Sequence, residues 1–290
     1  MERKRGILFI AAAATLMSTG GLLIKSVQAS AMTVALARAF FAALVFCPLM
    51  QWRKIRFSKH MAGLIISYVY LTFAFVSATK MTTSANAIIL QCTAPLWLYL
   101  AYIITGKKKI VFSECAPRLV ILAGILVILF DPANASGDAT KMIGNLLALS
   151  AGISYAAEQY FLEKEYPVSD ITVVGMLNIA MVLFIALFMH SQVSFAQVTL
   201  LNWGFLVFLG VFQIGISYVL FRKGVVAASA FEASILSLLE PILNPILVFF
   251  FLGEAPTIYT IAGFAVIMGG IVMTLIPGKT GDSDQGEAAC

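Results

Sequence analysis

The chain alternates between long apolar stretches and short segments that carry most of its charges. Residues 6–24, 60–79 and 81–106 contain no charged side chain. Each stretch fits one helix across a bilayer, which needs about 20 apolar residues. The run 171–221 has 51 uncharged residues, too many for one span, and polar residues near its middle divide it into two helices.

These runs predict an all-α, polytopic membrane protein with ten transmembrane helices. A transmembrane β-barrel would need alternating polar residues, and these runs are apolar all round. The expected helices are 6–24, 32–50, 61–79, 83–105, 116–131, 142–162, 171–189, 202–221, 229–252 and 257–276.

Composition supports this class, because 61% of the 290 residues are hydrophobic and only 11% are charged. Soluble domains carry about 25% charged residues, so this chain cannot cover a water-facing surface. A soluble enzyme and a nucleic-acid-binding protein are both excluded. The net charge of +5 is instead a signal of orientation.

The basic residues predict which side of the membrane each connection faces. If the N-terminus is inside, 15 of the 19 Lys and Arg residues lie on the cytoplasmic side. The outer connections hold Lys25, Lys80 and Lys141, and Arg38 lies within the second helix. By the positive-inside rule, we expect a multi-pass protein of the cell (inner) membrane with both termini in the cytoplasm.

The two halves of the chain resemble each other at an offset of 146 residues. Each half has five helices, an odd number, so the second half should enter the membrane inverted. The expected units are residues 1–131, residues 142–276 and a cytoplasmic tail, 277–290. The identical pairs are Ala87 and Ala233, Ile89 and Ile235, Leu90 and Leu236, Pro95 and Pro241, Gly124 and Gly270, Ile125 and Ile271, and Leu129 and Leu275.

The second half also carries a family pattern, which comprises Leu239-Glu240-Pro241, Leu252-Gly253-Glu254, Thr257 and Gly263. It resembles the end of the second repeat in the EamA family of the drug/metabolite transporter superfamily. In the first half, Ala94-Pro95-Leu96 and Gly124 resemble the matching repeat, although Lys107 replaces an acidic residue. The resemblance implies ten helices in two inverted repeats, with export of small metabolites as the commonest activity. It also implies a central cavity lined by the first, third, fourth, sixth, eighth and ninth helices.

Glu240 is the first candidate for a functional residue inside the membrane. A central charge costs roughly 2.5–3.5 kcal/mol on insertion scales, so it normally faces a partner or a wet cavity. Ser237 and Asn244 share its helical spacing. Glu240 can hold a cation or a substrate amine or take up a proton, or it can bond backbone groups freed by Pro241 and Pro245.

Glu158 heads a second polar cluster, with Ser154 one turn away and Tyr155 beside it. Either the cluster lines the inner vestibule, or Glu158 pairs with Lys164 or reaches the membrane interface.

Arg38 has no carboxylate in its own helix. It is expected to pair with a carboxylate or with carbonyl groups elsewhere, and the alternative is attraction of a substrate carboxylate. Glu232, near the start of the ninth helix, is expected to complement the helix dipole. Gly20 and Gly21 belong to a small polar patch of the first helix that either admits substrate or allows close packing.

The predicted site lies around the prolines, because interrupted helices near the midplane mark binding regions in inverted-repeat transporters. Its helix-break residues are Pro95, Pro241 and Pro245. Its substrate-binding residues are Gln91, Trp97, Ser154, Tyr155, Glu158, Gln213, Ser217, Ser237, Glu240 and Asn244.

The function predicted from these features is secondary transport by alternating access, with efflux of an amino acid or a related amphipathic or cationic compound. The alternative is an importer of a vitamin or nucleotide-like metabolite. No catalytic motif, metal-ligand spacing or cofactor motif occurs, so we expect no enzyme activity, metal or cofactor. The expected partners are a small-molecule substrate and the lipid bilayer, with no nucleic acid. Proton or ion coupling and the oligomeric state are left open.

Overall fold

The computed structural model describes residues 2–107, 110, 112–132, 139–162, 164, 166–228 and 230–275. All regular elements among these residues are helices. The expected tail, 277–290, and the basic residues Lys108 and Lys109 lie outside the described residues.

The helices of the first half follow the predicted apolar runs. They are α1 (Glu2–Ser26), α2 (Ala31–Phe46), α3 (Lys59–Met81), α4 (Ser84–Gln91), α5 (Ala94–Ile104) and α6 (Phe112–Leu129), with short 3₁₀ turns at Cys47–Leu49 and Trp52–Lys54. Side chains cap several of them: the hydroxyls of Ser30, Ser58 and Thr83 accept from backbone amides in the first turns of α2, α3 and α4.

The second half is also helical, and one of its segments is a π-helix. Its elements are α8 (Ala139–Leu162), α9 (Asp170–Phe188), a 3₁₀ turn (His190–Gln192), α10 (Leu200–Phe208), η4 (Leu209–Ile216), α11 (Ser217–Ala227), α12 (Ala230–Ser237), α13 (Leu239–Leu252) and α14 (Ile258–Leu275). The segment η4 is a π-helix between α10 and α11, and π-helical turns are rare and occur often at functional sites.

Eight helical segments of the described chain are long and apolar enough to cross a membrane. They include α4 with α5 as one segment and α10 to α11 as another. Neither α6 nor α8 is among them; α8 carries the buried polar residues Asn145, Ser154 and Glu158. The molecule is thus an all-helical, multi-pass membrane protein.

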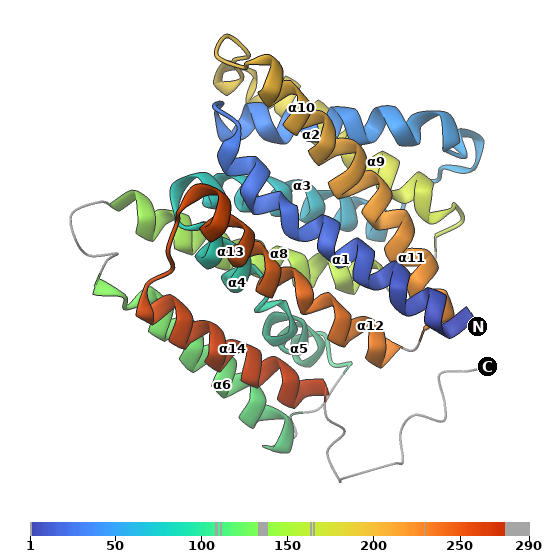
Figure 1. Ribbon diagram of the computed structural model, residues 1–290. Helices are drawn as coiled ribbons and strands as arrows, with labels where there is room; N and C mark the ends of the chain where they lie inside the picture. Colours follow the sequence, from blue (N-terminus) through green and yellow to red (C-terminus); the bar gives the residue numbers. More distant parts are fainter. Residues whose placement is uncertain are drawn as a thin grey trace.

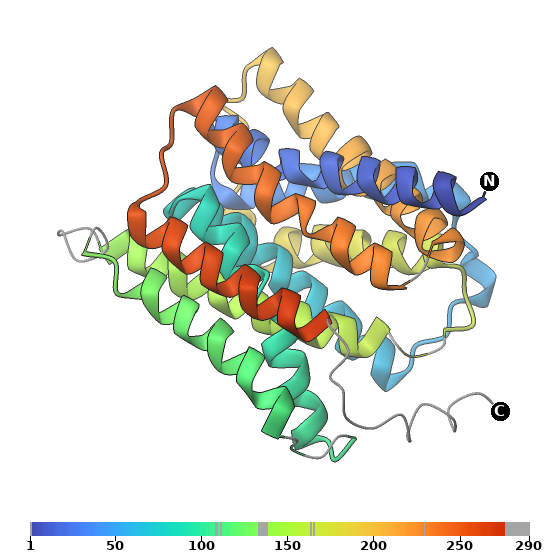
Figure 2. The ribbon, with the colours of Figure 1, turned by 60° about the horizontal axis from the view of Figure 1, so that its bottom comes forward.

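The helices pack in pairs that join the two halves of the chain. Helix α1 packs against α11 and α13, α2 against α9, α3 against α8, α4 against α13, and α6 against α14. In Figures 1 and 2, α1 and α14 run in opposite directions, so the chain enters α1 and leaves α14 on the same side of the bundle.

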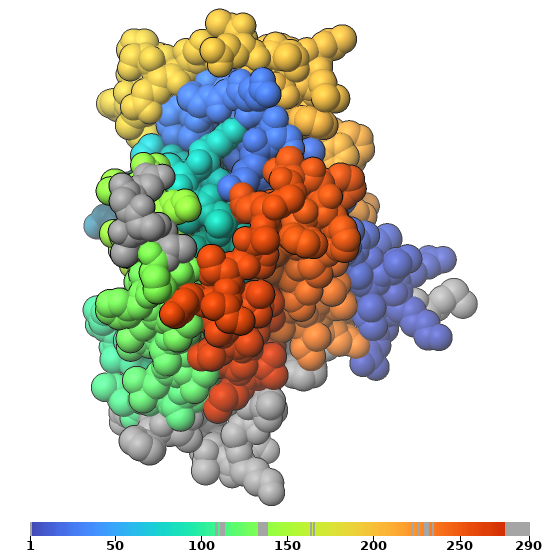
Figure 3. All heavy atoms as spheres, turned by 60° about the vertical axis from the view of Figure 1, so that its left-hand side comes forward, coloured from blue at the N-terminus to red at the C-terminus, as the bar shows by residue number. Residues whose placement is uncertain are grey.

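Helices α6 and α14 lie side by side at one edge of the bundle, and Figure 3 shows them adjacent on its surface. Glycines allow this close approach. A Cβ on Gly124 would lie 2.9 Å from the carbonyl oxygen of Gly263, and a Cβ on Gly263 would lie 2.9 Å from that of Gly124. Small residues serve such contacts in membranes, where backbones approach closely.

Candidate functional site

Two helices are interrupted at equivalent positions of the two halves. Helix α4 stops at Gln91 and α5 starts at Ala94, with Pro95 in its first turn. Helix α12 stops at Ser237 and α13 starts at Leu239, followed by Pro241. Proline has no amide hydrogen and clashes with the preceding turn, which accounts for both interruptions.

The third predicted helix-break residue, Pro245, lies inside α13, which continues to Leu252. The expected single helix 229–252 is two helices, and the break falls between Ser237 and Leu239. Pro241 and Pro245 stand on the same side of that break.

Charged side chains from three helices lie beneath the protein surface near these breaks. Arg38 of α2 is 8% exposed and Glu158 of α8 is 9% exposed, while Glu240 of α13 is partly buried. Arg38 interacts electrostatically with Glu240 and with Tyr68 of α3. Glu158 and Glu240 also both lie within electrostatic range of Tyr155 of α8, whose neutral hydroxyl they favour. We call Arg38, Tyr68, Tyr155, Glu158 and Glu240 the central site.

The end of α4 adjoins the central site. Cys92 directly follows Gln91, and it interacts electrostatically with Glu240. Opposite, the Tyr68 hydroxyl donates to Oδ1 of Asn178 at 3.0 Å, and Nδ2 of Asn178 donates to the carbonyl of Val174 at 2.9 Å. These bonds hold the Tyr68 ring against α9.

Several buried polar atoms at these helices have no hydrogen-bond partner within the described part of the chain. They are donors Nε and Nη1 of Arg38 and acceptors Oε1 of Gln91 and Oε1 of Gln213. Gln213 lies on η4, where its amide group faces Gly20 of α1. Buried polar groups are nearly always paired, so a polar ligand that forms hydrogen bonds with these atoms would gain binding free energy there.

Four predicted site residues instead make bonds within the helical scaffold. Ser154 donates to the carbonyl of Ser67 at 2.8 Å, Ser237 to that of Ala233 at 2.8 Å, and Ser217 to that of Gln213. Trp97 donates from Nε1 to the Thr93 hydroxyl at 3.1 Å. Their contact with a substrate remains a prediction.

Asn244 lies at one end of the bundle, and it is 1% exposed. Its Oδ1 accepts from the Ser84 hydroxyl at 2.8 Å. The Ser84 amide donates to Oε1 of Glu254 at 2.6 Å, and Oε2 of Glu254 pairs with Lys25. These contacts join the end of α1, the start of α4 and the end of α13.

A second chain of hydrogen bonds continues across the same end. Oδ1 of Asn145 accepts from the Thr82 hydroxyl at 2.6 Å and from Nδ2 of Asn86 at 3.1 Å. The Thr260 hydroxyl donates to Oδ1 of Asn86 at 2.8 Å. Both chains together close this end with buried polar contacts, and we call them the end cluster. Its members are Lys25, Thr82, Ser84, Asn86, Asn145, Asn244, Glu254 and Thr260.

Two other charged residues have structural surroundings. Glu232 lies in the first turn of α12, as a dipole partner should, and it also pairs with Arg3 at 2.6 Å. The described residues contain no ion pair between Glu158 and Lys164. The Lys164 ammonium lies 5.3 Å from the centre of the Tyr160 ring.

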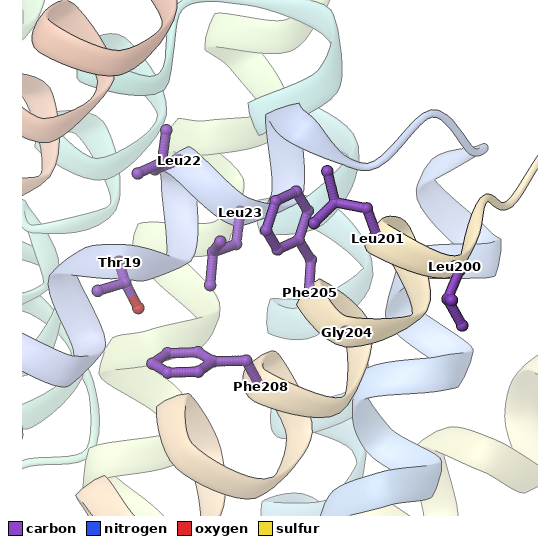
Figure 4. Close-up of a pocket in the computed structure, with 8 residues that line it drawn as sticks. All are labelled: Thr19, Leu22, Leu23, Leu200, Leu201, Gly204, Phe205 and Phe208. Carbon is purple, nitrogen blue, oxygen red and sulfur yellow. The ribbon is translucent and has the colours of Figure 1, made fainter.

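A groove at the side of the bundle has a different character. It encloses about 610 Å³ between α1 and α10, and Figure 4 shows Leu23 of α1 pointing toward Phe205 and Phe208. Thr19 is the one hydroxyl residue among those lining it. Such a lining suits contact with lipid chains rather than with a polar substrate.

The predicted site did not include Arg38 or Tyr68. For Arg38 a pair with a carboxylate or carbonyl groups elsewhere was expected; its charge acts on the carboxylate of Glu240, while its Nε and Nη1 have no hydrogen-bond partner among the described residues. The signal was present, since a charge within a span is expensive. Tyr68 gives no signal of its own among nine tyrosines. Within the described residues, no group of three or more His, Cys, Asp or Glu side chains is arranged to hold a metal ion.

Comparisons with known proteins agree with this architecture. An uncharacterized transporter from Archaeoglobus fulgidus is 24% identical over 270 residues, which cover 91% of this chain and 94% of the relative. A biotin transporter from Escherichia coli is 23% identical over 199 residues, or 67% of each chain. A solved crystal structure of 19% identity superposes with a TM-score of 0.63 over 93% of this chain and 97% of the other, which shows a shared fold.

A family model gives the assignment. The model of the EamA-like transporter family matches residues 4–130 and matches again at residues 142–276. The relatives are transporters, and none of these findings indicates an enzyme. The chain therefore belongs to the EamA-like transporter family, as a multi-pass membrane protein that transports small substrates.

Proposed function

We propose that this protein is a secondary transporter that exports an amino acid or a related amphipathic or cationic compound by alternating access. Ten spans would form two inverted five-helix repeats, residues 1–131 and 142–276, with both termini in the cytoplasm. The observation that carries the proposal is the central site, where the charged side chains of Arg38, Glu158 and Glu240 lie beneath the surface beside helix breaks at matching positions of the two halves.

The packing pattern supports the inverted repeat. Helices α2 and α9 are equivalents that pack against each other, and so are α6 and α14. Helix α8 is the equivalent of α1, and α3 is the equivalent of the segment from α10 to α11. Helix α1 packs against η4 and α11 of that segment, and α8 packs against α3. Such an exchange of partners is what a pseudo-two-fold axis between the halves would produce.

The central site supports binding of a polar substrate. Glu240 would hold a substrate amine or a cation, and Tyr155 lies within the electrostatic reach of both Glu240 and Glu158. A carboxylate inside a membrane is costly unless a positive group pairs with it, so binding of a substrate amine or a cation at Glu240 would be favourable.

The end cluster supports alternating access. Its hydrogen bonds join the ends of α1, α3 and α13 to the starts of α4, α8 and α14. If the N-terminus is inside, this end faces outward, and the state described is closed to the outside. Export would require these contacts to separate while the helices rock around the breaks.

A second candidate is an importer of a vitamin or nucleotide-like metabolite. Similarity to the biotin transporter of Escherichia coli favours this candidate. Both candidates use one alternating site, and they differ in the direction of net flux.

A ligand screen followed by counterflow tests the proposal. Purified protein is screened by thermal shift against amino acids, nucleosides, vitamins and cationic drugs, because a bound ligand raises apparent stability. Each labelled compound that raises Tm is then tested in proteoliposomes. We expect saturable counterflow of unchanged compound; flux without counterflow would indicate a channel, and a chemically altered compound would indicate an enzyme.

Net flux in oriented proteoliposomes separates the two candidates. Export predicts that substrate moves from the side of the N-terminus to the opposite side. Accumulation on the N-terminal side would favour the vitamin importer.

A further inference from the structure

Arg38 is the buried cation of the central site, and hydrogen bonds within the described residues leave two of its nitrogen atoms without a partner. It lies in the middle of α2, is 8% exposed, and has no hydrogen-bond partner at Nε or Nη1 within the described residues. A guanidinium has five N–H donors and no acceptor, so these two donors require an oxygen from elsewhere.

The neighbours of Arg38 leave that requirement unmet. Tyr68 donates its hydroxyl proton to Asn178, so it interacts with Arg38 through charge and, among the described residues, leaves Nε and Nη1 of the guanidinium without a hydrogen bond. Glu240 attracts Arg38 electrostatically, yet the described ion pairs, Arg3 with Glu232 and Lys25 with Glu254, do not include it. The Arg38 guanidinium is thus attracted by the Glu240 carboxylate, but the two groups form no ion pair among the described residues.

The charges of the central site offer a place to each charged group of a zwitterionic substrate. Glu158 and Glu240 offer two carboxylates to a positive group, and Arg38 offers the one guanidinium of the central site. The planar fork of a guanidinium matches the two oxygens of a carboxylate, which a single ammonium does not.

We propose that Arg38 binds a carboxylate of the transported substrate and thereby selects acids over the corresponding amides. This inference rests on the proposed transport function and adds one residue and one chemical requirement to it. Gln91, whose buried Oε1 also lacks a partner among the described residues, would accept a hydrogen bond from the same ligand.

Matched pairs of compounds test the requirement for a carboxylate. The probes are L-phenylalanine with L-phenylalaninamide, L-leucine with L-leucinamide, and biotin with biotinamide. The wild-type protein should respond to at least one acid in both thermal shift and counterflow. The concentration of the corresponding amide that gives a half-maximal response should be at least about 30-fold higher, the range expected when a buried charge pair loses one partner. Equal responses to acid and amide would overturn the proposal, and so would a response to amides alone or to no acid of the panel.

Two variants at one position test the residue itself. Arg38→Gln removes the charge and should abolish the preference for the acid, while Arg38→Lys keeps the charge without the planar fork and should keep part of it. The matched control is Arg53→Gln, which neutralises an exposed arginine of a 3₁₀ turn and should keep the full preference. An acid preference that survives in Arg38→Gln would overturn the assignment.

The double variant Arg38→Gln/Glu240→Gln separates binding from structure. Its ligand binding is measured by thermal shift, because Glu240→Gln is expected to abolish counterflow. If Arg38 served only to balance the charge of Glu240, removing both charges would restore folding and the acid preference of binding together. The proposal predicts restored folding without the acid preference. With the wild-type protein, saturable counterflow of nucleosides or cationic drugs without an acid preference would refute the role of Arg38 and leave the transport function standing; absence of all counterflow would refute the transport function.

Discussion

Replacement of Gly21 by alanine should open the end cluster. Gly21 lies on α1, against Ser84 of α4 and Asn244 of α13. An added Cβ would overlap the Ser84 hydroxyl and would lie 2.5 Å from Oδ1 and 2.6 Å from Nδ2 of Asn244. The methyl group therefore occupies the position of a hydrogen bond that joins α4 to α13.

The magnitude follows from that geometry. Overpacking of a tight interior costs about 1–3 kcal/mol. Loss of the hydrogen bond between Ser84 and Asn244 costs about 1 kcal/mol more. A penalty of about 2–4 kcal/mol corresponds to a shift of roughly 30- to 1,000-fold away from the closed end.

The assay is labelling of a single cysteine at the closed end. Ala85, in the first turn of α4 and 5% exposed, is replaced by cysteine in a background without the native cysteines. Gly21→Ala should increase the rate of labelling by a membrane-impermeant maleimide. Gly269→Ala is the matched control, because a Cβ there meets no atom within 4 Å. Unchanged labelling at Ala85→Cys in the Gly21→Ala protein would refute the close packing of α1 against the end cluster.

Three further predictions, which use four substitutions, test the account. Gly253→Ala should lower stability by about 1–2 kcal/mol in thermal unfolding, since Gly253 has φ of 68° and no neighbour within 4 Å, and an unchanged Tm would contradict the left-handed cap. Gly124→Ala should cost about 1–3 kcal/mol, because the new Cβ would lie 2.7 Å from Cγ1 of Ile267, and wild-type stability would contradict the α6–α14 contact. Lys25→Met should increase maleimide labelling of the closed end, and adding Glu254→Gln should give less than the additive effect in a double-mutant cycle, whereas full additivity would contradict their pairing.

The sequence predicts the course of the helices and the site's prolines because these depend on local patterns. Apolar run lengths determine the spans, and Pro95 and Pro241 mark the interruptions. The central carboxylates were also identifiable, because a charge within an apolar run is conspicuous.

The end cluster was not predictable, because its partners meet only in the folded bundle. Ser84 and Asn244 are 160 residues apart, and Asn86 and Thr260 are 174 apart. Each is an ordinary polar residue within its own helix. Gly21 had two interpretations in the sequence, and its neighbours favour close packing.

The π-helix was missed for a related reason. Residues 202–221 have a regular apolar pattern, and nothing in it distinguishes α-helical from π-helical turns. Among the described residues, the packing of η4 against α1 and α2 surrounds the wider turns that present Gln213.

The most direct test of the account is counterflow by Glu240→Gln in proteoliposomes. The labelled probe is the compound that gives the largest thermal shift with the wild-type protein. Glu232→Gln is the matched control, because it removes a carboxylate that pairs with Arg3 at the surface. At equal amounts of folded protein, Glu240→Gln should lose most or all counterflow while Glu232→Gln keeps it. Counterflow by Glu240→Gln at the wild-type rate would contradict the central site as the place of transport.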